Sequence, residues 1–397
     1  MDPVRNPFAP GAGTPPPELA GRADVIRDAV VALQRTAQRR PAQSHILTGL
    51  RGVGKTVLLN EIKKNAESES FLTIQIEAHE GKPFPELIVP GLRQALIKLS
   101  TFESAKQVAR RAMRVLKGFI GALKVATHGV EFSVSPESGT ADSGDIEADL
   151  PELMAAVGEA AAASGRPLVI LIDELQYLES REFSALIMAM HAVNQKSLPI
   201  ILIGAGLPQI LGLAGNSKSY SERLFVYPRI DALTADDAAI ALLNPVKGEG
   251  ARIDTAAIEE AIKITQRYPY FLQQWGHEAW NIATGDRITL KDMQKATPRA
   301  YAALDKSFFR VRFDRCTPSE KQYMRALAEF NDGKGRSGDI ADSLGVKVTS
   351  CAPTRSNLIK KGMIYSPSHG SNAFTVPLFH IFMRREVPNL SNGHGKR

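Results

Sequence analysis

The chain has 397 residues and a formal net charge of +7, with 44% hydrophobic and 23% charged residues. This composition is typical of globular proteins, and the length predicts two or three domains. No apolar stretch reaches the ~20 residues that span a bilayer, and the Pro- and Gly-rich start lacks the apolar segment of a secretory signal. The two cysteines, Cys316 and Cys351, have no metal-site spacing. We therefore expect a cytoplasmic protein with no membrane partner.

A phosphate-binding motif follows the first predicted strand. Residues 1–18 predict an extended leader, and the apolar run at 44–48 predicts a buried strand. Residues 49–56 read Gly-Leu-Arg-Gly-Val-Gly-Lys-Thr, which matches G-x-x-x-x-G-K-[ST]. Glycines let the backbone approach an anion closely, and the helix-forming segment after them would point its free N–H groups at phosphates. The predicted nucleotide-binding residues are Gly49, Gly52, Val53, Gly54, Lys55, Thr56 and Val57.

A second motif lies at residues 167–174, which read Pro-Leu-Val-Ile-Leu-Ile-Asp-Glu. Five consecutive aliphatic residues predict a central strand of a parallel sheet that is covered on both faces. Asp173 stands at the carboxyl end of this strand, where open α/β sheets bind ligands. We expect Lys55 to bind the β- and γ-phosphates, and Thr56 and Asp173 to hold Mg²⁺. Glu174 would polarise the attacking water, so the acidic pair favours hydrolysis over passive binding.

Strands alternate with helices through the first domain, which we place at residues 19–232. Further strands are predicted at 71–78, 198–204 and 224–230, and helices at 151–164 and 181–194. This alternation predicts a parallel sheet with helical crossovers. The stretch 101–146 interrupts the order as an insertion, with a basic amphipathic helix followed by a Gly-, Ser- and Asp-rich loop.

The remainder of the chain predicts two further domains and a polar tail at 387–397. Residues 233–303 have helical patterns and no strand pattern, which predicts a small helical subdomain whose first helix is capped by Thr234. Residues 304–386 predict three helices and then a β-hairpin, the first helix beginning at the Thr-Pro-Ser-Glu signal at 317–320. This order describes a winged helix, whose third helix can enter the major groove of DNA.

Positive charge is concentrated in this last domain. Between residues 304 and 386 fourteen residues are basic and eight are acidic, so the segment holds most of the net charge. The candidates for contacts with DNA phosphates, around the third helix, are Lys347, Arg355, Lys360 and Lys361. The alternative is a solvated helix face on a domain used for packing, because basic charge alone is weak evidence of binding.

Three other places are candidates for nucleotide contacts. Arg223 precedes the last core strand, where it would reach a γ-phosphate as an arginine finger, in cis or from a neighbouring subunit. Its alternative role is an ion pair with an acid at the sheet edge. Gly21 and Arg22 either shape an adenine pocket or form a simple turn before the first core helix. Pro269 and Tyr270 either close over the base or ribose, or the aromatic residues of their segment belong to the core of the helical subdomain.

These motifs resemble those of the AAA+/STAND-type P-loop ATPases related to the archaeal and eukaryotic origin-recognition ATPases, in the bacterial branch of AAA family ATP-binding proteins. The resemblance covers roughly residues 19–386 and rests mainly on the two Walker motifs. It implies an AAA+ ATPase core of the ASCE type, a helical lid and a C-terminal winged helix. Such ATPases usually carry a polar sensor at the end of the fourth core strand, whereas residues 203–209 here read Ile-Gly-Ala-Gly-Leu-Pro-Gln. Gln209 is the only substitute, and we expect slow hydrolysis.

The sequence therefore predicts an ATPase that uses the binding and hydrolysis of Mg-ATP to drive a conformational change. In the first hypothesis this change is coupled to double-stranded DNA through the winged helix. In the second, the protein is a STAND-like nucleotide switch for signalling or self-assembly, with slow hydrolysis, no DNA binding, and another copy or another protein as its partner.

Overall fold

The computed structural model describes residues 1–11, 13–126, 134–217 and 221–390. Part of the predicted insertion loop, 127–133, and the end of the predicted tail, 391–397, lie outside the described residues. The chain forms two compact units. The core unit consists of Arg22–Gly49 and Lys55–Ile230. The C-terminal unit consists of Met1–Gly21, Leu50–Gly54 and Asp231–Arg397.

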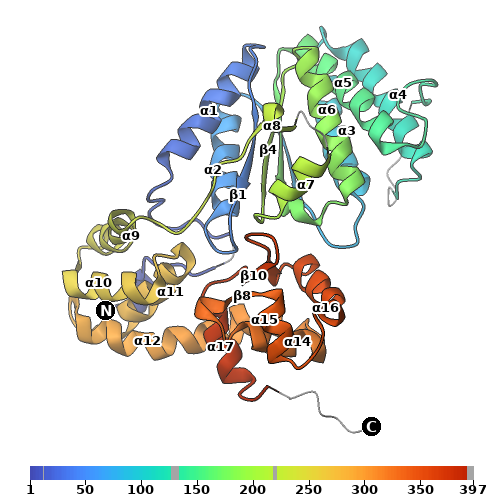
Figure 1. The fold of residues 1–397 in the computed structure, drawn as a ribbon. Helices are drawn as coiled ribbons and strands as arrows, with labels where there is room; N and C mark the ends of the chain where they lie inside the picture. The colour runs from blue at the N-terminus through green and yellow to red at the C-terminus, as the bar shows by residue number, and fades with distance from the viewer. Residues whose placement is uncertain (12, 127–133, 218–220, 391–397) are drawn as a thin grey trace. The chain divides into compact units, whose positions relative to one another are not determined.

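A five-stranded parallel sheet with the strand order β2-β3-β4-β1-β5 forms the centre of the core unit (Figure 1). Its strands are β1 (Ser44–Thr48), β2 (Leu72–Glu77), β3 (Leu168–Asp173), β4 (Ile200–Gly206) and β5 (Phe225–Val226). Strands β1, β3 and β4 are buried along their whole length, which explains why they are apolar runs without alternation. The predicted parallel sheet is confirmed, although the range 224–230 yields only the two residues of β5.

Helices cover both faces of this sheet. Helices α1 and α2 pack together on one face, and α3, α5 and α6 lie on the other, with α4 against α3 and α5 (Figure 1). Their bounds are α1 (Ala23–Ala37), α2 (Lys55–Ser68), α3 (Phe84–Leu99), α4 (Lys106–Ala122), α5 (Ile146–Ser164) and α6 (Ser180–Gln195). Two shorter helices, α7 (Ile210–Ser217) and α8 (Ser221–Leu224), connect β4 to β5. The amphipathic helix of the insertion is α4, whose apolar face is buried at Val115, Leu116 and Phe119.

The C-terminal unit begins with a helical part: α9 (Ala235–Gly248), α10 (Thr255–Thr265), α11 (Pro269–Ile282) and α12 (Leu290–Leu304). Thr234 caps α9 as predicted, accepting a hydrogen bond from the Asp237 N–H. Two strands of two residues each, β6 (Arg252–Ile253) and β7 (Arg287–Ile288), pair in parallel. The prediction that 233–303 contains no strand is therefore wrong at these positions, because pairings this short leave no periodic signal in the sequence.

The N-terminal leader, with the short 3₁₀ helix η1 (Pro3–Arg5), packs along α11. Phe8 is 2% exposed, and a Cβ at Gly276 of α11 would lie 2.7 Å from the Phe8 ring. The indole N–H of Trp280 donates to the carbonyl of Asp2 at 2.8 Å. A glycine on α11 therefore provides the space in which the leader is held.

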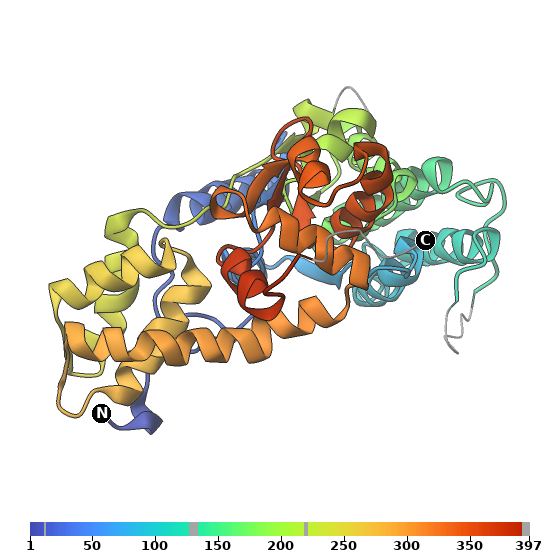
Figure 2. The same ribbon diagram turned by 60° about the horizontal axis from the view of Figure 1, so that its bottom comes forward.

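Helix α12 continues into the last part of the chain without a loop. The π-helical segment η3 (Asp305–Phe309) joins it to α13 (Arg310–Asp314), and the three run as one rod (orange in Figure 2). Beyond it lie α14 (Pro318–Leu327), η4 (Asn331–Gly333), β8 (Lys334–Arg336), α15 (Ser337–Ser343), α16 (Val348–Lys360), β9 (Ile364–Tyr365), β10 (Ser371–Phe374) and α17 (Phe379–Glu386). The predicted capping box at Thr317 and Glu320 and the antiparallel β9–β10 hairpin are both present.

One additional strand distinguishes this part from the prediction. Strand β8 pairs with β10, so the hairpin becomes a three-stranded sheet in the order β8-β10-β9. Its sequence, Lys-Gly-Arg, has no strand pattern, and only the pairing with β10 makes it a strand. None of the helices in the described part of the chain has the length and apolar content that crossing a bilayer requires.

A partly buried ion pair anchors the end of α16 to the start of α14. The Lys361 ammonium donates to Glu320 Oε2 at 2.7 Å and to the Arg315 carbonyl at 3.0 Å. Glu320 is 2% exposed and also accepts the Thr317 N–H. Burial acts to raise the pKa of Glu320, but the hydrogen bonds from Lys361 and Thr317 outweigh it and leave this pKa below its ordinary value. Lys361 is therefore part of the packing of its own domain.

We expect Lys361→Ala to lower the free energy of unfolding by about 1–3 kcal/mol at pH 7, because a buried carboxylate loses a charged donor. Because folding lowers the pKa of Glu320, its ionised carboxylate stabilises the folded state at pH values above the pKa that it has in the unfolded chain. This stabilisation is lost as the pH falls through the lower pKa of the folded protein. The cost of the substitution should therefore shrink below about pH 4. Urea unfolding at pH 7 and at about pH 3 measures both, with Lys360→Ala, an exposed neighbour, as the control. Equal losses for the two variants at pH 7 would contradict this role.

Candidate active site

The carboxyl ends of β1 and β3 lie on either side of β4, at one edge of the core sheet. The motif 49–56 follows β1 directly, and Asp173 is the last residue of β3. The N–H of Gly49 donates to the Gly206 carbonyl at 3.2 Å, which ties the start of the motif to the end of β4. After β1 the chain crosses to β2 at the far edge, and after β4 it crosses back over β1 to β5. Such a topological switch point is where parallel α/β sheets bind ligands.

Three predicted site residues come together at this edge. Lys55 is the first residue of α2, is 7% exposed, and donates from Nζ to the Gly49 carbonyl at 2.9 Å. The hydroxyl of Thr56 donates to Asp173 Oδ2 at 2.6 Å. Thus a hydroxyl and a carboxylate lie in direct contact beside the ammonium that the motif supplies.

The Asp173 carboxylate is a buried charge with partial compensation. Asp173 is 8% exposed, and its Oδ1 accepts a hydrogen bond from the N–H of Glu174 at 2.8 Å. Burial raises the pKa of Asp173 above its ordinary value, and the nearby Glu174 charge raises it further. The hydrogen bond from Thr56 and the charge of Lys55 act in the opposite direction. A cation at this carboxylate would supply the compensation that burial removes.

Glu174 is held by a residue that the sequence analysis did not single out. Its backbone is left-handed, with φ of 55°, a conformation that is uncommon outside glycine and often found at functional sites. The side-chain amide of Gln176 donates to Glu174 Oε2, and Gln176 Oε1 accepts the N–H of Leu207 at 3.0 Å. Gln176 lies in the short 3₁₀ helix η2 (Leu175–Tyr177). It therefore links the acid to the end of β4, and the only sequence signal was a polar residue two positions after Glu174.

The end of β4 is crowded where the resemblance implies a polar sensor side chain. A Cβ at Gly204 would lie 2.3 Å from the Leu175 side chain, and one at Gly206 would lie 2.1 Å from Ile210 and 2.8 Å from Gln176 Oε1. A side chain at either glycine would have to displace side chains of η2 or α7 that pack against this strand. Gln209 follows, and its buried Oε1 has no hydrogen-bond partner among the residues that are described.

The tip of the glycine-rich motif belongs to the C-terminal unit. The Tyr268 hydroxyl donates to the Arg51 carbonyl, and the N–H of Tyr270 donates to the Gly52 carbonyl at 3.3 Å. Pro269, the predicted base or ribose contact, is the first residue of α11. The residues on either side of it, rather than Pro269 itself, make these hydrogen bonds. Sequence analysis missed Tyr268 because its contact is more than 200 residues distant in the chain.

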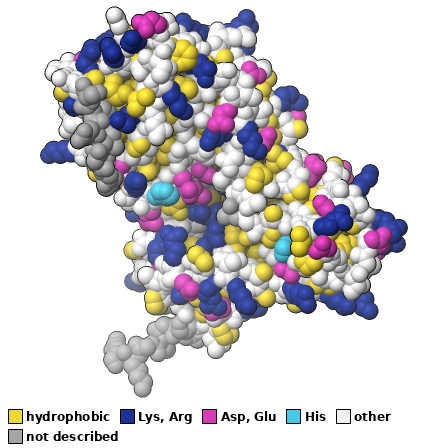
Figure 3. Space-filling view, turned by 180° about the vertical axis from the view of Figure 1, so that it is seen from behind, with side chains coloured by type: hydrophobic (Ala, Val, Ile, Leu, Met, Phe, Trp, Pro, Cys, Tyr) yellow, Lys and Arg dark blue, Asp and Glu magenta, His cyan; other side chains and the backbone are white. Residues whose placement is uncertain are grey.

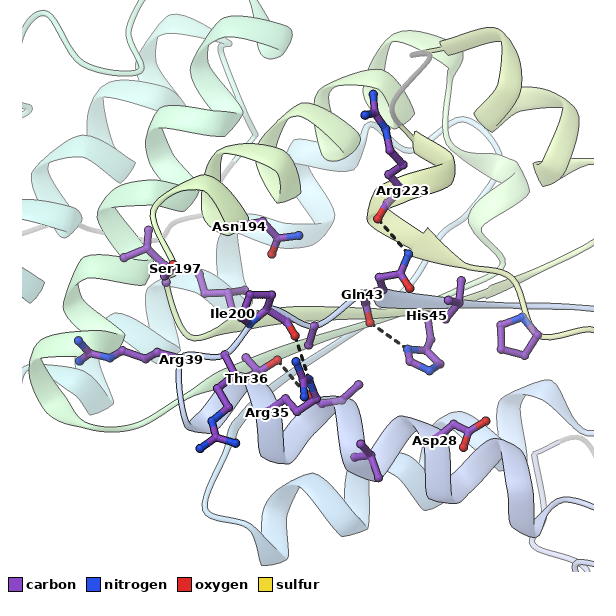
Figure 4. A pocket seen from close by; sticks show the side chains of 18 of the residues that line it. Asp28, Arg35, Thr36, Arg39, Gln43, His45, Asn194, Ser197, Ile200 and Arg223 are labelled. Carbon is purple, nitrogen blue, oxygen red and sulfur yellow. Dashed lines mark hydrogen bonds between the residues drawn. The ribbon is translucent and has the colours of Figure 1, made fainter.

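Arg223 lies at the opposite end of β1 from Lys55. Its helix α8 leads into β5, where Phe225 pairs with Ser44, the first residue of β1. The side-chain amide of Gln43 donates to the Arg223 carbonyl at 2.9 Å, and the guanidinium points away from this contact (Figure 4). Arg223 is among the residues that line an open pocket of about 800 Å³, together with Arg35, Arg39 and Arg40. The structure thus does not bring Arg223 to the phosphate-binding motif of its own chain.

The remaining nucleotide candidates are Gly21, which ends the N-terminal segment of the C-terminal unit, and Arg22, which begins the core unit. Gly21 has a φ of 67°, and a Cβ there would lie 2.6 Å from the Asp237 carboxylate, so the turn and its packing both require glycine. Arg22 is 8% exposed and directly precedes α1. These observations account for Gly21 as a turn residue.

The four DNA candidates divide into two pairs. Lys347, just before α16, and Lys360, its last residue, are exposed. Arg355 donates to Asn372 Oδ1 at 2.6 Å and to the Ser366 hydroxyl at 3.1 Å, and Lys361 is paired with Glu320. On the face of the molecule seen in Figure 3, basic side chains are interspersed with acidic ones. Only Lys347 and Lys360 therefore remain available for an external partner.

Comparisons with known proteins agree with this geometry. Residues 18–203 match the family described as AAA ATPase domain, and residues 306–383 match a domain of unknown function, DUF8462. No curated protein matches the chain.

Similar solved structures extend over most of the chain. The Walker-type ATPase PABY2304 of Pyrococcus abyssi is 18% identical, with a TM-score of 0.58 over 94% of this chain and 97% of that one. ORC1 of Aeropyrum pernix in complex with DNA is 16% identical, with a TM-score of 0.47 over 94% of each chain. The RuvB Holliday junction branch migration motor of Thermotoga maritima is 14% identical, with a TM-score of 0.42 over 89% of this chain and 92% of that one. At 18% identity the first likeness concerns the fold. Residues 18–203 are thus similar to the AAA ATPase domain family, and the chain shares the fold of the Walker-type ATPase of Pyrococcus abyssi.

Proposed function

We propose that this protein is a Mg-ATP-dependent ATPase of the AAA+ type, in which nucleotide binding and hydrolysis drive a conformational change. The observation that carries the proposal is the direct contact of Thr56 with Asp173 beside Lys55. A nucleoside triphosphate requires an ammonium for its phosphates, and its metal requires a hydroxyl and a carboxylate. All three groups lie here at the carboxyl edge of a parallel sheet.

The residues present fit Mg²⁺ rather than a metal held by the protein alone. No cluster of three or more His, Cys, Asp or Glu side chains suited to a metal occurs within the described residues. Mg²⁺ usually keeps several waters and is bound through one or two protein groups together with substrate phosphates. Thr56 and Asp173 are such a pair. When bound, Mg²⁺ would neutralise the charge that develops on the phosphate oxygens.

The other side chains have roles that follow from their contacts. The Lys55 ammonium would exchange the Gly49 carbonyl for the β- and γ-phosphate oxygens. Glu174 would orient and deprotonate the attacking water, and Gln176 would keep its carboxylate in place relative to β4. Because Arg223 lies at the far end of β1, its role as an arginine finger requires a neighbouring subunit, and thus a homo-oligomer.

For the output of the ATPase we propose DNA binding through the C-terminal helices and sheet, read as a winged helix. The support is the element order helix–strand–helix–helix–strand–strand and the exposed start of α16. Lys347 lies there between Val346 and Val348, which are 42% and 47% exposed. An exposed helix start with a basic residue is suited to a DNA groove and its phosphates.

A second candidate is a nucleotide switch with slow hydrolysis, acting on another protein or another copy. The observation that favours it is the crowding at Gly204 and Gly206, which restricts the space for a polar sensor at the end of β4. An ATPase without this group would hold the triphosphate longer between turnovers. The two candidates share the Mg-ATP site and differ in turnover and in the partner.

Asp173→Asn should separate stability from nucleotide binding. Because folding raises the pKa of Asp173, its carboxylate opposes folding at pH values above that pKa. We expect the nucleotide-free variant to melt at the same temperature as wild type or higher at pH 7.5. The stabilisation by Mg²⁺ and a non-hydrolysable ATP analogue, about 2.7 kcal/mol at 100 times Kd, should disappear.

Differential scanning fluorimetry with the analogue, in Mg²⁺ or in EDTA, measures both effects. Asp236→Asn, at an exposed position of α9, is the matched control and should respond to the analogue as wild type does. A full Mg²⁺-dependent shift in Asp173→Asn would remove this residue from the site.

Lys347→Ala with Lys360→Ala should weaken binding to double-stranded DNA at every sequence. Each lost phosphate contact lowers the slope of log K against log salt by about 0.9, so the double variant should lose about 2 from that slope. Fluorescence anisotropy over a salt series measures it. Lys291→Ala with Lys295→Ala removes two exposed charges from α12 and is the control. Equal slopes in wild type and both variants would contradict a DNA contact at α16.

A further inference from the structure

Two consecutive carbonyl groups of the glycine-rich motif accept hydrogen bonds from the start of α11. The hydroxyl of Tyr268 donates to the Arg51 carbonyl, and the N–H of Tyr270 donates to the Gly52 carbonyl. The approach is close as well, because a Cβ at Gly52 would lie 3.1 Å from the Tyr268 ring and 3.3 Å from Tyr270 Cβ. Gly52 has a φ of 84°, so both its conformation and its surroundings require glycine.

These two hydrogen bonds fix the direction of the N–H groups in the motif. In a planar trans peptide the C=O of one residue and the N–H of the next point in opposite directions. Holding the Arg51 carbonyl therefore turns the N–H of Gly52 away from Tyr268. Holding the Gly52 carbonyl likewise turns the N–H of Val53 away from Tyr270. Both N–H groups therefore point away from the start of α11, and successive main-chain N–H groups are what a phosphate-binding loop offers to an anion.

Tyr268 is built into the unit as a permanent donor. It is 3% exposed, and its ring lies 5.1 Å from that of Phe271. Burial raises the pKa of its phenol well above the ordinary value, so the hydroxyl keeps its proton at any physiological pH. Tyr270 differs in this respect, because its ring stacks on Phe308 at 4.6 Å and its own hydroxyl has no hydrogen bond among the described residues.

The same tip of the motif is also tied to the C-terminal sheet. The N–H of Arg51 donates to the Thr375 carbonyl at 3.2 Å. Thr375 directly follows β10 and is 1% exposed, and its hydroxyl donates to the Gly362 carbonyl at 2.6 Å. Arg51 thus has its carbonyl held by Tyr268 and its N–H held by the segment after β10. A shift of Arg51 would therefore move both its hydrogen bond to Tyr268 and its hydrogen bond to Thr375.

We propose that Tyr268 is a positioning residue that aims the Gly52 and Val53 amides at the nucleotide phosphates, and that Arg51 passes a change at these amides to the segment 371–376. This inference rests on the proposed function. It makes the loop a mechanical link between the phosphates and the last domain, through hydrogen bonds to the main chain alone.

The test compares Tyr268→Phe with Tyr270→Phe in the full chain. Each variant loses one hydroxyl and keeps its ring, but only the first loses a hydrogen bond to the motif. We expect Tyr268→Phe to weaken the Kd of a Mg²⁺-bound, non-hydrolysable ATP analogue about threefold to tenfold, the range of one hydrogen bond. Tyr270→Phe should bind as wild type does.

Hydrogen–deuterium exchange with mass spectrometry supplies a readout that a general loss of stability would not give. Without nucleotide, peptides covering 49–57 should exchange faster in Tyr268→Phe alone, while peptides from α5 stay unchanged. With the analogue, exchange at 371–376 should change in wild type and in Tyr270→Phe, and should change less in Tyr268→Phe.

The outcomes separate this inference from the proposed function. Wild-type affinity together with wild-type exchange in Tyr268→Phe would overturn the positioning role even if the protein binds ATP. An equal loss in both variants would overturn it too, since the Tyr268 hydroxyl would then not be the cause. A wild-type protein that binds no analogue would overturn the proposed function, whereas faster nucleotide-free exchange at 49–57 in Tyr268→Phe alone would still support the role of Tyr268 in holding the loop.

Discussion

The carboxylate of Asp173 at the end of a fully buried strand is the constraint on which the core depends. A charge removed from water must be met by hydrogen bonds or by an opposite charge. The Thr56 hydroxyl and the Glu174 N–H donate two hydrogen bonds to this carboxylate. The positive charge of Lys55, and a cation bound at the site, would compensate the remaining negative charge. This requirement brings the start of α2 to the end of β3 across β4. The site is therefore arranged before any ligand is bound, at the cost of a carboxylate whose pKa is raised.

The segment after Asp173 determines how the neighbouring strand can end. Glu174 takes a left-handed conformation, and η2 then folds back over β4 so that Leu175 and Gln176 occupy the space above Gly204 and Gly206. Gln176 uses that position to join Glu174 to the backbone of Leu207. One local turn thus both fixes the candidate base and restricts the space for a sensor on β4. The same feature is compatible with hydrolysis and with slow turnover, which is why turnover itself decides between the two proposed functions.

The sequence was sufficient where the chemistry is local. The glycines of the motif, the run of aliphatic residues before Asp173 and the caps at Thr234 and Thr317 each reflect a demand on a few neighbouring residues. It was insufficient where partners are distant, as for Gln176 with Leu207, Tyr268 with Arg51, and Lys361 with Glu320. Strands β6, β7 and β8 are defined only by their pairing with another strand, so no hydrophobic pattern in the sequence predicts them. Arg223 comes just before β5, which is parallel to β1, so it lies at the amino ends of these strands, away from the motif that follows β1.

Glu174 is the residue proposed to convert nucleotide binding into turnover, so substituting it is the most informative experiment. Steady-state ATP hydrolysis would be measured for wild type and Glu174→Gln, each with and without double-stranded DNA. We expect turnover in wild type and a loss of at least about 100-fold in the variant, with analogue binding retained. Stimulation of the wild type by DNA would favour the DNA-coupled ATPase, and its absence would favour the switch. Equal turnover in wild type and Glu174→Gln would contradict the assignment of this site.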